Sequence, residues 1–206
     1  MGKYLKFTVL SAAALLMSGC IMSGAGKAAD QYYTALEGGD ADTAVEYYSE
    51  EAEDELENFR KITGGIRQMF ADYELGTETE EELRTLLKTI VSRSYSSHKI
   101  TSEERVSDTE YKILAEVEMI TEESSASCLN ALDYDSFYNE IADELTEINR
   151  NEGEEAANRF MIIQMIHYLN LSAEDAFAGA EYETGTYKLT MILEGEDWKI
   201  ADIERE

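Results

Sequence analysis

The sequence predicts an α+β fold, in which N-terminal helices pack on a curved antiparallel sheet with a helical insertion between strands. Three observations predict it. Apolar residues recur at helical spacing from residue 28 to about residue 90. The period then changes to two in the segments 111–119 and 187–200, which is typical of half-buried strands. Helical spacing returns between these segments, from about 130 to 180.

The start of the chain has the pattern of an export signal. Lys3 and Lys6 precede an apolar run, Phe7–Met17, whose 11 residues suit a signal peptide and are too few to cross a membrane. The "SGC" that ends at Cys20 resembles the bacterial lipobox, with methionine where leucine is commonest. The resemblance implies that the Cys20 thiol receives a diacylglyceryl group and becomes the first mature residue. The protein is then expected on the extracytoplasmic face of a cell membrane, held by lipid.

This prediction divides the chain into three parts. Residues 1–19 are the signal peptide, residues 20–27 are the lipidated cysteine with a flexible glycine-containing tether, and residues 28–206 are a single domain. The alternative is an ordinary cleaved signal, or a signal anchor, with a chance cysteine.

The helices before the sheet are marked by their caps. A helix from Ala28 is expected to end at Gly38-Gly39, and a second is expected after Asp40 as its N-cap. Helical spacing continues over 56–70, and a further helix is expected near Thr79, which forms a capping-box pattern with Glu82.

The sheet is predicted from alternation. Ile113, Ala115 and Val117 fall on one face of a strand, and the polar segment 96–110 before it predicts a weaker strand and a hairpin turn. The chain ends in a second hairpin, with "EGED" as its turn. Strands joined by turns pair antiparallel.

The insertion at about 130–180 is predicted to be helical. Apolar spacing indicates one helix over 134–148 and another over 154–171. The second is apolar over most of its circumference, so we expect it to be well buried.

The charge of the chain excludes one class of partner. With 44 acidic and 17 basic residues, the formal net charge is −27. Such a surface repels phosphate, so no nucleic-acid partner is expected, and a broad contact with anionic lipid is disfavoured. The simplest interpretation is solubility and self-repulsion, and the alternative is a site for a cation or a cationic partner.

No metal site is predicted. The segments that begin at Asp40 and Asp133 carry acids at positions 1, 3 and 12 of a calcium loop, but helix-core residues stand where an oxygen ligand and a glycine are required. Both aspartates are therefore interpreted as helix N-caps. The two histidines, His98 and His167, have no zinc-ligand spacing around them.

Candidate functional residues are few. Gln164, His167 and Asn170 form a polar line along the apolar helix, which could edge a pocket or be its solvent edge. Cys128 has no basic neighbour in the sequence to lower its thiol pKa, so a buried thiol is expected. No catalytic residue and no cofactor is predicted.

Two segments carry a resemblance to a known family. "YYTALEGGDADTAVEYYSEEA" at 32–52 and "YKLTMILEGEDWKIADIE" at 187–204 resemble the NTF2-like (cystatin-like) lipoproteins of Gram-positive bacteria. The resemblance implies a cavity between the helices and the concave sheet. It favours a non-enzymatic binding or accessory module of the cell envelope, for a small molecule, a peptide or an envelope protein. The alternatives are a small cavity enzyme of hydrolase or isomerase type and, less favoured, a metal- or solute-binding protein.

Overall fold

The computed structural model describes residues 22–50, 52 and 75–206. The predicted signal peptide 1–19, Cys20 and the helical pattern over 56–70 lie outside the described residues.

A four-stranded antiparallel sheet forms one layer of the fold, and it confirms the predicted α+β class. The strands are consecutive in the sheet: β1 (Tyr95–Arg105), β2 (Glu110–Ile120), β3 (Tyr182–Glu194) and β4 (Asp197–Arg205). The turns of the β1–β2 and β3–β4 hairpins lie at the same end of the sheet, since Glu110 pairs with Ile192. We call this the turn end.

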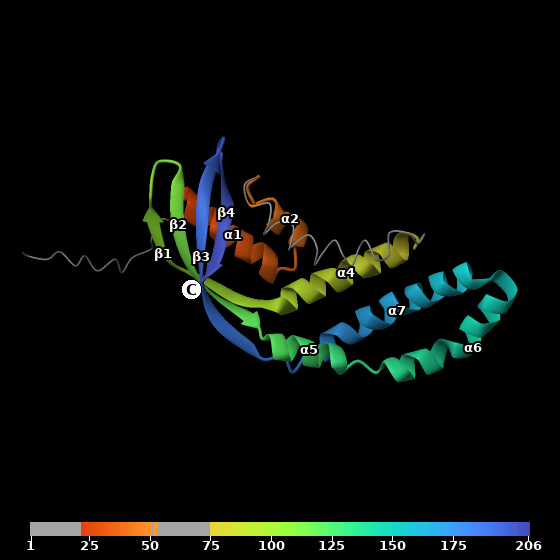
Figure 1. Cartoon of the computed structure of the whole chain (residues 1–206). Coiled ribbons are helices and arrows are strands. Elements are labelled where there is room, and N and C mark those ends of the chain that lie inside the picture. Colours follow the sequence, from red (N-terminus) through yellow and green to blue (C-terminus); the bar gives the residue numbers. More distant parts are fainter. Residues whose placement is uncertain (1–21, 51, 53–74) are drawn as a thin grey trace, which may run out of the picture.

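One face of the sheet carries the main core. Ile113, Ala115 and Val117 on β2 are at most 1% exposed, which confirms the predicted alternation. Leu189 and Met191 on β3 continue the same face and are fully buried. Helix α1 (Gly24–Glu37) covers these residues, as Figure 1 shows.

The short helix α2 (Ala41–Val45) follows α1, and the predicted cap at Asp40 is confirmed. The Asp40 carboxylate accepts a hydrogen bond from the Thr43 backbone N–H at 3.0 Å. The hydrogen bond from the Thr43 hydroxyl, and then this one from the backbone, lower the pKa of Asp40, because both stabilise the charged form. The presence of an aspartate at position 40 is therefore explained by its role as the N-cap of α2.

The flexible tether predicted over residues 20–27 is wrong for its second half. Helix α1 already begins at Gly24, and the Ser23 hydroxyl caps it by accepting from the Gly26 N–H at 2.9 Å. The Glu103 carboxylate on β1 accepts a hydrogen bond from the Ser23 N–H at 3.0 Å. A Cβ on Gly26 would lie 2.4 Å from a Glu103 oxygen. These glycines thus provide close packing between helix and sheet, where the sequence suggested flexibility.

Removing this contact should loosen the start of α1. We expect Glu103→Ala to lower the free energy of unfolding by about 1.5 kcal/mol, because a charge-assisted bond to a helix N-terminus is lost. Glu104→Ala, at the exposed neighbouring position, is the matched control and should cost no more than about 0.5 kcal/mol. Urea unfolding measures both, and equal losses would contradict the role given to Glu103.

Helix α4 (Thr77–Ser94) begins earlier than predicted, and without the predicted capping box. Its N-cap is Gly76, which has a φ of 79° and makes no side-chain cap. A glycine in this left-handed conformation redirects the chain into the helix, so the hydroxyl of Thr79 is not needed as a cap. Thr79 is instead buried within the first turn.

The predicted helical insertion is present between β2 and β3. It contains α5 (Glu122–Asn130), α6 (Tyr134–Glu152) and α7 (Glu154–Ala176), so it begins at Glu122 and not near residue 130. Asp133 caps α6 as predicted, accepting from the Ser136 N–H at 2.9 Å.

Helices α4, α6 and α7 extend together away from the sheet, and we call them the arm (Figure 1). They leave from the end opposite the turn end, because α4 enters β1 at Tyr95 and α5 follows Ile120. A second, smaller core joins α4 to α7: Leu83, Leu87 and Ile166 are its buried centre. None of the helices described has the length and apolar character needed to cross a membrane.

The expectation that the second insertion helix is well buried is wrong. Only Ala157, Ile166 and Ala173 of α7 are buried, and Leu171 is 68% exposed. Because α7 is held between α4 and α6 in an extended arm and not inside a compact core, most of its apolar side chains are half-buried.

Candidate functional site

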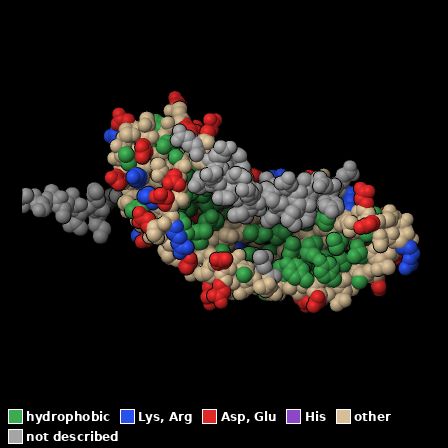
Figure 2. Space-filling view, viewed as in Figure 1, with side chains coloured by type: hydrophobic (Ala, Val, Ile, Leu, Met, Phe, Trp, Pro, Cys, Tyr) green, Lys and Arg blue, Asp and Glu red, His purple; other side chains and the backbone are tan. Residues whose placement is uncertain are grey.

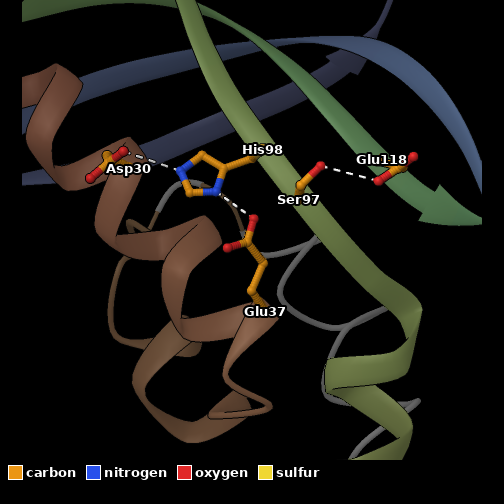
Figure 3. Close-up of polar contacts among 5 residues, drawn as sticks. All are labelled: Asp30, Glu37, Ser97, His98 and Glu118. Atoms are coloured by element: carbon orange, nitrogen blue, oxygen red, sulfur yellow. Dashed lines mark hydrogen bonds and ion pairs between the residues drawn. The ribbon is translucent and has the colours of Figure 1, made fainter.

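In the described chain, a histidine lies between two carboxylates on the surface of α1. His98 on β1 points toward α1, and its side chain is only 8% exposed (Figure 3). Its Nδ1 lies 2.6 Å from an oxygen of Glu37, and its Nε2 lies 3.2 Å from an oxygen of Asp30. We call Asp30, Glu37 and His98 the histidine clamp.

The spacing of α1 creates this clamp. Asp30, Tyr33 and Glu37 are three and four residues apart, so they form one stripe along the helix. The imidazole lies between the two acids and stacks on the Tyr33 ring, with centroids 5.3 Å apart and an interplanar angle of 29°. The role of His98 could not be predicted from the sequence, because its partners lie 61 and 68 residues away in the chain. The available signal in the sequence was the spacing of Asp30, Tyr33 and Glu37, which places two acids on either side of a tyrosine along one face of α1.

The clamp does not present a free nitrogen for chemistry. A ring that carries both protons can donate to both carboxylates at once, whereas a neutral ring can donate to only one of them. Each nitrogen already faces a carboxylate from α1, so a substrate would have to displace one of them. The geometry therefore indicates attachment of α1 to the sheet and not general acid–base catalysis.

The neighbouring serine does not form a catalytic pair with this histidine. Ser97 lies next to His98 in β1, and its hydroxyl donates to Glu118 on β2 at 3.2 Å, away from the clamp (Figure 3). Successive side chains of a strand point to opposite faces, which keeps the hydroxyl and the imidazole apart. Across the described ranges, no group of three or more His, Cys, Asp or Glu side chains is placed to hold a metal ion.

Among the described residues, the largest pKa shifts belong to buried tyrosines of the main core. Burial raises the pKa of Tyr32 and Tyr33, and it raises the pKa of Tyr95 to about 12. The Tyr32 and Tyr48 hydroxyls hydrogen bond to each other at 2.8 Å. These phenols stay neutral at physiological pH, so they act as packing residues with satisfied hydroxyls.

The polar line predicted as a pocket edge lies on α7. His167 is half-exposed, and its Nδ1 lies 2.9 Å from a carboxylate oxygen of Glu82, which joins α7 to α4. Gln164 and Asn170 are half-buried on the same helix. The two hollows described below are lined by other residues. A pocket edge at Gln164, His167 and Asn170 stays a prediction.

The described residues line surface hollows, and two of them have volumes of about 450 Å³. One lies beside the start of α1, where Gly24, Tyr47 and Trp198 are among its lining residues. The other lies at the distal end of the arm, between the last turn of α6 and the first turns of α7, and includes Ile148 and Phe160. The concave face of the sheet is occupied by the α1 side chains Tyr32, Tyr33 and Leu36.

Comparisons with known proteins give a structural likeness and no family. No family model matches the chain, and no curated protein matches it significantly. Among solved structures, the chain is similar to "a putative lipoprotein (ycdA)" from Bacillus subtilis, with 15% identity and a TM-score of 0.41. The match covers 86% of this chain and 51% of the other, so this chain spans about half the length of that protein. A likeness at this level does not carry an argument about function.

Cys128 is a buried free cysteine in α5, as predicted. Cys20, the predicted lipidation site, lies outside the described residues.

Proposed function

We propose that this protein is a lipoprotein anchored through Cys20 to the extracytoplasmic face of a cell membrane. The support is the "SGC" that follows a short apolar run, together with the start of the folded domain. Ser23 is already fixed by Glu103, so only two residues, Ile21 and Met22, separate the anchor from the fold. The three steps from Cys20 to Ser23 span about 10 Å when fully extended, which would hold the domain directly at the membrane surface.

This short connection favours one orientation of the domain. The start of α1 lies at the turn end of the sheet, because Ser23 contacts Glu103 and Gly24 packs near Trp198. The arm leaves the sheet from the opposite end (Figure 1). A chain anchored at Cys20 would thus direct its arm away from the membrane. The "SGC" that ends at Cys20 is the observation that carries the proposed anchor, and this orientation follows from it.

We infer that the protein is a binding or accessory module of the cell envelope and not an enzyme. The space between helix and sheet, where the NTF2-like resemblance implies a cavity, is filled by α1. His98, whose side chain is 8% exposed, has both nitrogens engaged by carboxylates. The alternative of a small cavity enzyme gains no support from these contacts. The ligand of this module is a small molecule, a peptide or another envelope protein.

Cell fractionation tests the anchor. Cys20→Ala should move the protein from the membrane fraction to the soluble fraction, because two acyl chains hold a protein at a bilayer and their loss leaves no comparable attachment. Cys128→Ala is the matched control: it removes the other cysteine and should leave the protein in the membrane fraction. Membrane retention of the Cys20→Ala protein would contradict the proposed anchor.

A further inference from the structure

The hollow at the distal end of the arm combines apolar side chains with two acids and one arginine. Ile148, Phe160 and Ile163 supply large apolar side chains, and Ala156 leaves space between them. Glu152, Glu155 and Arg159 supply the charged lining. A volume of about 450 Å³ is in the range of pockets that accept a bulky apolar group.

The arm also exposes apolar side chains away from this hollow, at its end next to α5. Tyr134 and Tyr138 on α6 are 36% and 46% exposed, and Leu171 on α7 is 68% exposed. Figure 2 shows hydrophobic side chains gathered over the arm. Large apolar patches on a protein surface mark interaction sites more often than chance.

The charge around these apolar residues selects the partner. The insertion from Glu122 to Ala176 contains thirteen acidic residues, two arginines and no lysine. A second copy of the same chain would bring the same negative charge against it, and anionic lipid or nucleic acid would be repelled. A positively charged partner is complementary.

The two acids of the hollow are available for such a partner. Within residues 22–50, 52 and 75–206, neither Glu152 nor Glu155 takes part in an ion pair. They lie on either side of Gly153, the single residue that joins α6 to α7. An incoming cation therefore has two carboxylates within reach at the tip of the arm.

We propose that the arm-tip hollow binds a cationic amphipathic helix of a partner protein. Two antiparallel helices form a groove into which a third helix can lay its apolar face. One large apolar side chain of the partner enters the space between Ile148 and Phe160. A lysine or arginine one turn away pairs with Glu152 and Glu155. This inference rests on the proposed function as a binding module, and it assigns the partner chemistry and the site.

Peptide titration tests the site. The probe is a fluorescent 18-residue amphipathic peptide of leucine and lysine, added to the full chain in mild detergent at low salt, with binding to empty micelles subtracted. We expect saturable binding. Glu152→Gln with Glu155→Gln should weaken it about five- to tenfold, since two ion pairs at the surface are lost. Ala156→Trp should weaken it more than tenfold by filling the hollow.

A pair of acids on α6 controls for net charge. Asp143→Asn with Glu147→Gln makes the same charge change on α6 at exposed positions that do not line the hollow. It should weaken binding less than twofold. The Glu152 and Glu155 pair keeps the test valid if Ala156→Trp does not fold, and circular dichroism establishes the fold of each variant.

Four results would overturn the proposal: no saturable binding, equal weakening by the two charge pairs, equal binding of a leucine–glutamate peptide, or self-association through the hollow in sedimentation equilibrium. The assay needs no membrane, so its outcome is separate from the fractionation of the Cys20→Ala protein. A failed anchor leaves peptide binding unchanged, and failed peptide binding leaves the anchor unchanged.

Discussion

Gly39→Ala is expected to lower the free energy of unfolding by about 3 kcal/mol, from left-handed strain and overpacking together. Gly39 ends the α1–α2 connection with a φ of 72°. A Cβ at this position would lie 2.2 Å from the Lys88 carbonyl oxygen on α4, which is a backbone atom and cannot rotate away. The loss of stability measures how closely the α1–α2 connection packs on α4 of the arm. Urea unfolding measures this loss.

Gly195→Ala is the matched control for this prediction. Gly195 also has a positive φ, 65°, in the β3–β4 turn, but nothing lies within 4 Å of a Cβ placed there. Its replacement should cost only the conformational strain, about 1 kcal/mol. Equal losses for the two variants would mean that the approach of α1 to α4 is looser than the structure has it.

His98→Leu is expected to cost about 2–3 kcal/mol, because it leaves Asp30 and Glu37 without their hydrogen-bond partner. The figure is below that for a fully buried ion pair, since the side chains of Asp30 and Glu37 are 46% and 28% exposed. Leucine has a volume similar to that of histidine, so most of the lost stability comes from the hydrogen bonds to Asp30 and Glu37. Thermal or urea unfolding measures the change.

The second histidine provides the control for the first. His167→Leu removes a pair in which the histidine is 51% exposed, and it should cost less than about 1 kcal/mol. In the His98→Leu background, Asp30→Asn with Glu37→Gln should restore part of the lost stability. An unpaired amide destabilises the folded state less than an unpaired carboxylate does. If His98→Leu costs no more than His167→Leu, the clamp does not hold α1 to the sheet.

The sheet and the helix caps could be predicted because their signals are local. Alternation placed Ile113, Ala115 and Val117 on the core face, where the structure has them. Asp40 and Asp133 cap helices through hydrogen bonds to residues three positions later. A signal contained within a few residues is readable from one sequence.

The histidine clamp and the start of α1 could not be predicted because they depend on contacts across the fold. Gly24 and Gly26 are ordinary tether residues in sequence, and only Trp198 and Glu103 show that they permit close packing. His98 is unremarkable until α1 is placed over β1. The half-exposed state of α7 was missed for a related reason, since an apolar helix in an extended arm has the same composition as one in a core.

Mass spectrometry of the N-terminal peptide from membranes of the native cell is the most direct test of the proposed function. We expect a chain that begins at Cys20 with a diacylglyceryl group on its sulfur. A chain that begins elsewhere, or a Cys20 with an unmodified thiol, would contradict it.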